Sequence, residues 1–194
     1  MSELNAFLEL AGMLVTDPRT VVLFSLLVAA AAIDVRHERI PNWLTLAGLG
    51  FGLVYSTFVP FWAKHGVLWS LGGAGIGFGA LFPLWLMRVT GAGDVKLMAM
   101  TGALLGVHAI PMALLGSLIA GGLFAILFAV RHGQLRTMLA NLVRMMHLGG
   151  IAVAAGGSLR FATTGWLSVG KVPFAVPIAA GTITTVVAVH FGFL

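Results

Sequence analysis

The chain of 194 residues is 59% hydrophobic and only 9% charged, and its mean hydropathy is +1.04. This composition excludes an ordinary soluble domain and indicates a membrane protein with several spanning segments. The net charge of +5 is typical of cations that flank membrane helices, so we expect contacts with membrane lipids and no nucleic-acid partner.

The apolar segments set the expected architecture. A first segment, Leu4 to Val15, is too short to span a bilayer and is expected to lie on its surface. Longer apolar segments follow at residues 20–35, 42–60, 66–87, 94–109, 111–130 and 172–193. Since a spanning helix needs roughly 20 residues, we predict an all-α polytopic membrane protein with about six transmembrane helices. The break between the fourth and fifth helices is expected around His108 and Pro111.

We expect one membrane-embedded domain over residues 1–194. Residues 1–19 form an N-terminal extracytoplasmic segment in this interpretation, and residues 131–171 form a cytoplasmic or interfacial loop. Apolar residues recur at helical spacing in that loop, while Arg136 and Arg144 share another face. This pattern predicts an interfacial amphipathic helix before the last transmembrane helix.

The cations predict the orientation. With the N-terminus outside and six alternating helices, only Arg19 and Lys64 of the 11 Lys and Arg residues lie outside, as the positive-inside rule favours. This orientation brings the end of the first helix and the beginning of the fourth to the cytoplasmic face.

Two acids, Asp34 and Asp94, lie in or against these apolar segments. A carboxylate at the bilayer centre costs about 3 kcal/mol, so such acids are candidates for function. Two carboxyl groups that share one proton can activate a water and hydrogen-bond a carbonyl group. Asp34 and Asp94 are therefore the predicted catalytic pair, and the sequence leaves open which acid is the general base.

Further site candidates surround these acids. Gly91 and Gly93 precede Asp94 and permit close approach of a peptide backbone. Arg36 and Lys96 each follow an acid by two residues, about 200° around a helix, so neither is placed to neutralise its neighbour. They are interpreted as contacts either with lipid headgroups or with a substrate.

Four motifs together resemble the type IV prepilin peptidases, which are intramembrane aspartic proteases of the Gly-x-Gly-Asp group. The resemblance extends over almost the whole chain from about residue 20. Its motifs are Asp34-x-Arg36, Ile40-Pro41-Asn42, Gly91-x-Gly93-Asp94-x-Lys96 and Lys171-Val172-Pro173-Phe174. Two positions depart from the family pattern, namely Ala175, where Gly is common, and Asn42, where many longer members have Asp.

The resemblance implies a membrane aspartic endopeptidase of the bacterial inner membrane. Its substrates would be prepilins or pseudopilins, whose leader peptide it removes at the cytoplasmic face. Asp34 and Asp94 would be catalytic, and the substrate would be positioned by Gly91, Gly93, Arg36, Lys96 and Lys171. No metal or organic cofactor is expected.

The resemblance also bears on a second activity, because bifunctional family members carry a cysteine-containing insert associated with N-methylation. The connection from Val35 to Pro41 is too short for that insert, and the chain has no cysteine. We therefore expect the short, peptidase-only branch serving Flp-type, tight-adherence pili, without N-methyltransferase activity.

The residues argue against two other classes of protease. A zinc protease needs His-Glu-x-x-His, but His37-Glu38 is not followed by a second His at the required position. Ser117 and Ser158 follow glycines without a recognisable base partner for a serine protease. The alternative that stays open is a small proton- or cation-coupled transporter with the two aspartates as ion sites.

Overall fold

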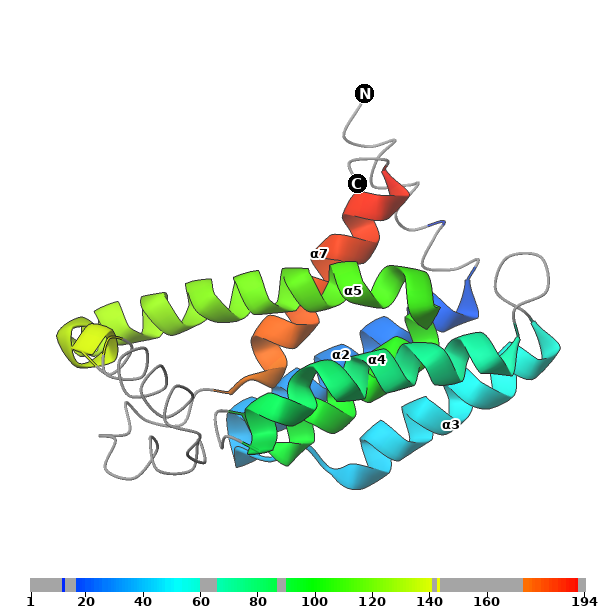
Figure 1. Ribbon diagram of the computed structural model, residues 1–194, viewed down its shortest axis with the longest axis horizontal. Coiled ribbons are helices and arrows are strands. Elements are labelled where there is room, and N and C mark those ends of the chain that lie inside the picture. The colour runs from blue at the N-terminus through cyan, green and yellow to red at the C-terminus, as the bar shows by residue number, and fades with distance from the viewer. Residues whose placement is uncertain are drawn as a thin grey trace, which may run out of the picture.

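The computed structural model describes residues 17–59, 66–86, 90–140 and 173–191, together with the single residues 12 and 143. Every regular element in these ranges is helical, which confirms the predicted all-α fold. The long helices form a bundle (Figure 1), and they are α2 (Pro18–His37), α3 (Asn42–Phe58), α4 (Val67–Leu86), α5 (Ala92–Arg131) and α7 (Ala175–His190).

Local capping signals determine where α2 begins and ends. The Asp17 side chain accepts a hydrogen bond from the Arg19 N–H at 3.0 Å, and Pro18 occupies the first turn, where its missing N–H costs nothing. At the other end Glu38 adopts a left-handed conformation (φ 52°), and its N–H donates to the Asp34 carbonyl at 2.8 Å. Pro41 then caps α3, so only residues 38–41 join α2 to α3.

Helix α5 bends at Gly106, whose dihedral angles (φ 75°, ψ 179°) lie in a region that essentially only glycine adopts. Beyond the bend the second part of α5 runs back along the bundle, beside α4 in the view of Figure 1. The predicted break around His108 and Pro111 was therefore misplaced. Pro111 lies inside the helix shortly after the bend, and the bend itself falls at a residue without a Cβ, which its dihedral angles require.

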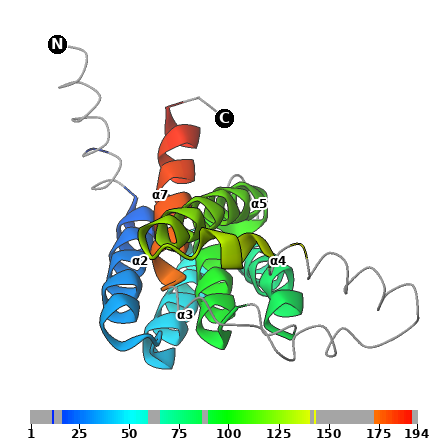
Figure 2. The ribbon, with the colours of Figure 1, turned by 90° about the vertical axis from the view of Figure 1, so that its left-hand side faces the viewer.

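The first part of α5 is the centre of the bundle. Residues 97–104 are all buried, and α5 contacts α2, α3 and α4 (Figure 2). Glycines permit this close packing, because a Cβ on Gly73 would overlap the backbone of Gly102 and a Cβ on Gly77 would overlap that of Met98. A buried hydrogen bond from Ser70 Oγ to the Ala103 carbonyl (2.6 Å) also joins α4 to α5.

The second part of α5 packs against α7 in the same way. A Cβ on Gly116 would overlap the backbone of Gly181, and a Cβ on Gly121 would contact the Phe174 ring. Ser117 Oγ lies 3.3 Å from the Ile178 carbonyl, which adds a buried polar contact. This packing brings the beginning of α7 to the end of the bundle where α2 ends and α5 begins.

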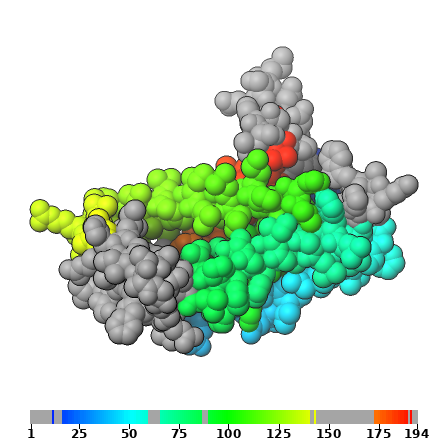
Figure 3. Space-filling view, viewed as in Figure 1, coloured from blue at the N-terminus to red at the C-terminus, as the bar shows by residue number. Residues whose placement is uncertain are grey.

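The outer surface is apolar, as expected for a membrane protein. In the described ranges α2, α4 and α5 are long and apolar enough to cross a membrane. Leu68 on α4 and Leu123 on α5 are 80% and 68% exposed, and these two helices cover one face of the molecule (Figure 3). The number of six spanning helices stays a prediction.

Two other predicted segments lie largely outside the described residues. Residues 135–140 are helical, but most of the remaining predicted interfacial helix and loop up to residue 171 is not described. The same holds for the predicted surface segment from Leu4 to Val15, of which only residue 12 is described.

Candidate active site

Asp34 lies in the last turn of α2 and is only 7% exposed. Its Oδ2 atom accepts a hydrogen bond of 3.1 Å from the N–H of Ala175, the first residue of α7. The N–H groups of a first helical turn have no partner within the helix, and the positive end of the helix dipole favours a negative group there. Asp34 thus caps a helix that lies 141 residues away in the sequence.

Asp94 lies in the first turn of α5 and is also 7% exposed. Its Oδ2 atom accepts a hydrogen bond of 2.9 Å from the N–H of Gly91, which is the residue that caps α5. This contact is the acidic half of a capping box, in which the third helical residue reaches back to the cap. The Asp94 N–H in turn donates to the Gly91 carbonyl at 3.2 Å.

The structure places the two acids at adjoining helix ends. Helices α2 and α5 are in contact, with Asp34 in the last turn of α2 and Asp94 in the first turn of α5. Each acid holds one oxygen on a backbone N–H, while its Oδ1 atom makes no hydrogen bond within the described residues. Hydrolysis by two carboxyl groups requires oxygens that can reach a water and a substrate carbonyl group.

No metal-binding cluster of three or more His, Asp or Glu side chains occurs in the described part of the chain.

Of the two predicted glycines, Gly91 is exposed and supplies the N–H that holds Asp94. Gly93 is half-buried, and a Cβ there would lie 3.1 Å from the Ile40 Cβ. The two glycines therefore serve different purposes, one capping α5 and the other permitting contact with the α2–α3 connection.

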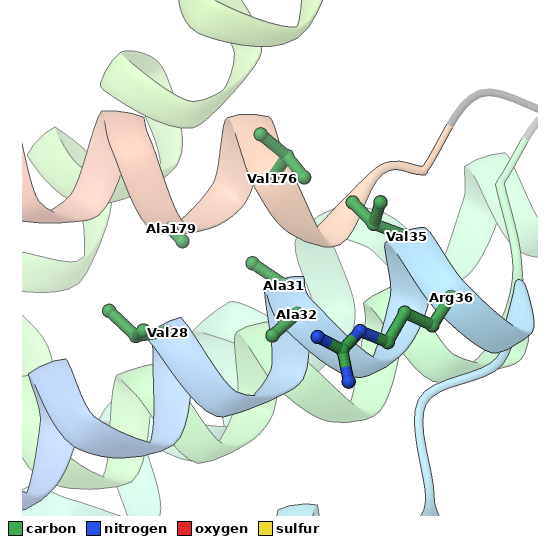
Figure 4. A pocket seen from close by; sticks show the side chains of 7 residues that line it. All are labelled: Val28, Ala31, Ala32, Val35, Arg36, Val176 and Ala179. Atoms are coloured by element: carbon green, nitrogen blue, oxygen red, sulfur yellow. The ribbon is translucent and has the colours of Figure 1, made fainter.

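The three predicted cations lie in different places. Lys96 Nζ donates to Asn42 Oδ1 at 2.9 Å. Arg36 lines an apolar groove of about 470 Å³ between α2 and α7, together with Val28, Ala31, Ala32, Val35, Val176 and Ala179 (Figure 4). Lys171 lies outside the described residues.

Two partners in this region were not predicted from the sequence. The Ala175 N–H is a backbone group, and no residue type marks it in advance. Asn42 belongs to the Ile40-Pro41-Asn42 motif, but no local pattern pairs it with Lys96, which is 54 residues away. Both pairings depend on the packing of helices that are distant in sequence.

Comparison with known proteins shows a match to the model of the type IV leader peptidase family over residues 21–126. This range contains both acids, both glycines, Arg36 and Lys96, but not Lys171 or α7. A prepilin leader peptidase/N-methyltransferase of Stutzerimonas stutzeri is 36% identical over 102 residues, or 49% of this chain and 34% of the relative. The protein with the same name from Xanthomonas campestris is 38% identical over 121 residues, or 56% and 40%.

A third similar protein, again named prepilin leader peptidase/N-methyltransferase, comes from Klebsiella pneumoniae. It is 36% identical over 104 residues, or 48% of this chain and 43% of the relative. The matches thus span between about a third and two fifths of the length of these curated relatives. No solved structure matches the chain.

Proposed function

This chain belongs to the type IV leader peptidase family, and on that premise we propose that it is an aspartic endopeptidase that removes the leader peptide from prepilin or pseudopilin substrates. Asp34 and Asp94 are the catalytic residues of this proposal. The relatives support a leader peptidase, and they give no support to the transporter alternative.

One observation carries the proposal. Two buried carboxyl groups lie at the adjoining ends of two helices that contact each other, and both belong to the segment that matches the family. Each is oriented through one oxygen by the N-terminus of a helix, α7 for Asp34 and α5 for Asp94. A purely structural role would not require two buried acids at the same end of the bundle, because buried like charges repel each other.

The proposed reaction is hydrolysis of one peptide bond. One carboxylate takes a proton from a water, and the resulting hydroxide attacks the scissile carbonyl carbon while the other, protonated acid hydrogen-bonds the carbonyl oxygen. The proton then passes to the leaving nitrogen as the C–N bond breaks. The products are a leader with a new carboxylate and a mature protein with a new amine. Either acid can take either role.

The surroundings are suited to a substrate with an apolar segment. The apolar groove between α2 and α7 lies beside Asp34, because Val35 follows this acid and Val176 follows Ala175. We propose that Gly91, Gly93, Arg36, Lys96 and Lys171 help to position the substrate. In the proposed orientation the site lies at the cytoplasmic face of the bacterial inner membrane.

We further propose that the activity is limited to the peptidase, as in the branch serving Flp-type pili. The α2–α3 connection has four residues, 38–41, and the chain has no cysteine. The relatives' names include N-methyltransferase, so this part of the proposal needs its own assay. After cleavage, labelled S-adenosylmethionine is expected to leave no methyl group on the new N-terminus.

The central experiment is cleavage of a prepilin-like precursor by the purified protein in detergent. We expect Asp34→Asn and Asp94→Asn each to abolish release of the leader while leaving expression and membrane insertion intact. Asp17→Asn is the matched control, because Asp17 is exposed and Asn caps a helix as well as Asp does. Substantial cleavage by either site variant would refute the catalytic pair.

A further inference from the structure

The short α2–α3 connection is bonded to the backbone of Asp34 and contacts the residues on either side of Asp94, namely Gly93 and, through Asn42, Lys96. We propose that residues 38–41 together with Asn42 form a spacer that sets the separation of the Asp34 and Asp94 carboxyl groups. Ile40 and Asn42 are positioning residues in this spacer. The inference rests on the proposed function for its catalytic consequence, but its geometric part can be tested independently.

The first residue of the spacer, Glu38, is hydrogen-bonded to Asp34. The Glu38 N–H donates to the Asp34 carbonyl at 2.8 Å, which closes the last turn of α2. Glu38 is the one described residue other than glycine with a positive φ, at 52°. Its left-handed conformation ends the helix one turn after the acid. The direction in which the connection leaves α2 is therefore fixed relative to Asp34.

The middle of the spacer rests against the beginning of α5. A Cβ on Gly93 would lie 3.1 Å from the Ile40 Cβ, which is tighter than an ordinary contact. The Ile40 side chain thus lies directly over the backbone of the residue before Asp94. Because χ1 of a β-branched side chain is stiff, Ile40 is suited to hold a fixed distance.

The end of the spacer is tied to the other side of Asp94. Asn42, the first residue of α3, accepts a hydrogen bond of 2.9 Å from Lys96 Nζ. Residues 93 and 96, on either side of the acid, are therefore both held by the same short segment. Since the first residue of that segment, Glu38, is hydrogen-bonded to the Asp34 carbonyl, a shift of the spacer moves one acid relative to the other.

A positioning role differs in its consequences from a purely stabilising role. Asn42 and Lys96 are both exposed, and one exposed hydrogen bond contributes little to overall stability. Misplacement of a reacting group by about 1 Å can nevertheless cost up to about a hundredfold in rate. The spacer therefore predicts a change in kcat without matching changes in KM or thermal stability.

The test is a double-mutant cycle on prepilin cleavage with the full chain. We expect Asn42→Leu to lower kcat about tenfold with little change in KM or Tm, and Asn42→Asp to restore the rate because its carboxylate still accepts from Lys96. The double variant Asn42→Leu/Lys96→Met is expected to be no slower than Lys96→Met alone, since both changes remove one interaction. Thr57→Ala, at the other end of α3, is the exposed control.

Three kinetic results would overturn the spacer, namely wild-type kcat in Asn42→Leu, multiplied losses in the double variant, or an effect on KM alone. The last would instead indicate direct contact with the substrate. A geometric measurement covers the case in which the wild-type protein cleaves nothing, which would refute the proposed function. Because the chain has no cysteine, nitroxide labels on Val35→Cys and Ala92→Cys report specifically the distance between the end of α2 and the beginning of α5, which carry the two acids. Asn42→Leu should broaden that distribution, and an unchanged distribution would contradict the spacer.

Discussion

The two proposed catalytic acids are held in the same way by partners of opposite origin. Asp34 and Asp94 are equally buried, and each binds a backbone N–H at the beginning of a helix through its Oδ2 atom. The partner of Asp94 is three residues away, at the cap of its own helix. The partner of Asp34 is 141 residues away, on α7.

This difference divides the site into a local half and an assembled half. The Asp94 contact forms with the first turn of α5 and needs no other element. The Asp34 contact exists only when α7 is docked, which depends on the packing of Gly116 against Gly181 and on the bend at Gly106. Damage to the α5–α7 contact should therefore disturb Asp34 and spare Asp94.

The largest expected effect comes from Gly116→Leu. A Cβ at this position already overlaps the Gly181 backbone, so a leucine must push α7 away and release Asp34 from Ala175. Overpacking typically costs about 1–3 kcal/mol, and we expect cleavage to be lost because one catalytic group is displaced. The measurements are leader release and the Tm of the detergent-purified protein.

The matched control is Gly122→Leu on the same helix, where a Cβ would meet nothing within 4 Å. This variant should keep the activity and Tm of the wild type. Equal activity in Gly116→Leu and Gly122→Leu would show that the assembled half does not depend on this contact.

A smaller loss is expected for Gly106→Ala, which removes the residue that allows α5 to return to α7. Alanine in this region of φ and ψ costs roughly 1–3 kcal/mol, so the Tm should fall and cleavage should weaken. Gly79→Ala, also in a helix and with open space around it, should have little effect. A Tm equal to that of the wild type in Gly106→Ala would argue against the bend.

The same division explains what the sequence could predict. The apolar segments and the common end of the bundle for both acids follow from local patterns. Hydropathy depends on residues within a few helical turns, and alternation of short-looped helices then places both acids at one face. The all-α fold and the identity of the candidate acids were accessible for this reason.

What escaped the sequence was decided by packing between distant segments. The break in α5 was expected around His108 and Pro111, but the non-helical backbone lies at Gly106. Gly106 is one of 26 glycines, and no local sequence pattern distinguishes it as one that adopts a positive φ. The hydrogen-bond partners of Asp34 and Lys96 could not be predicted from the sequence either, since a free N–H and an amide oxygen occur at many helix ends.

Replacing each acid by leucine should separate the two halves by stability. Asp34→Leu leaves the Ala175 N–H without an acceptor in a buried place, at a cost of about 1–3 kcal/mol. Asp94→Leu loses a capping contact with the exposed Gly91, at a cost of about 1 kcal/mol. The corresponding Asn variants keep an acceptor oxygen and should unfold close to wild type. Chemical unfolding in detergent ranks the four variants, and a larger loss for Asp94→Leu than for Asp34→Leu would reverse the comparison.

The smallest effect concerns the backbone that follows Asp34, where Glu38 holds a left-handed conformation at φ 52°. Side chains with a Cβ are strained there by roughly 1–2 kcal/mol, and glycine is not. Glu38→Gly should therefore be about 1 kcal/mol more stable than Glu38→Ala. The alanine variant is the right reference, because both substitutions remove the same carboxylate and differ only in the backbone. Equal unfolding midpoints would mean that the end of α2 is not held in this conformation and that the direction of the connection after Asp34 is not fixed by it.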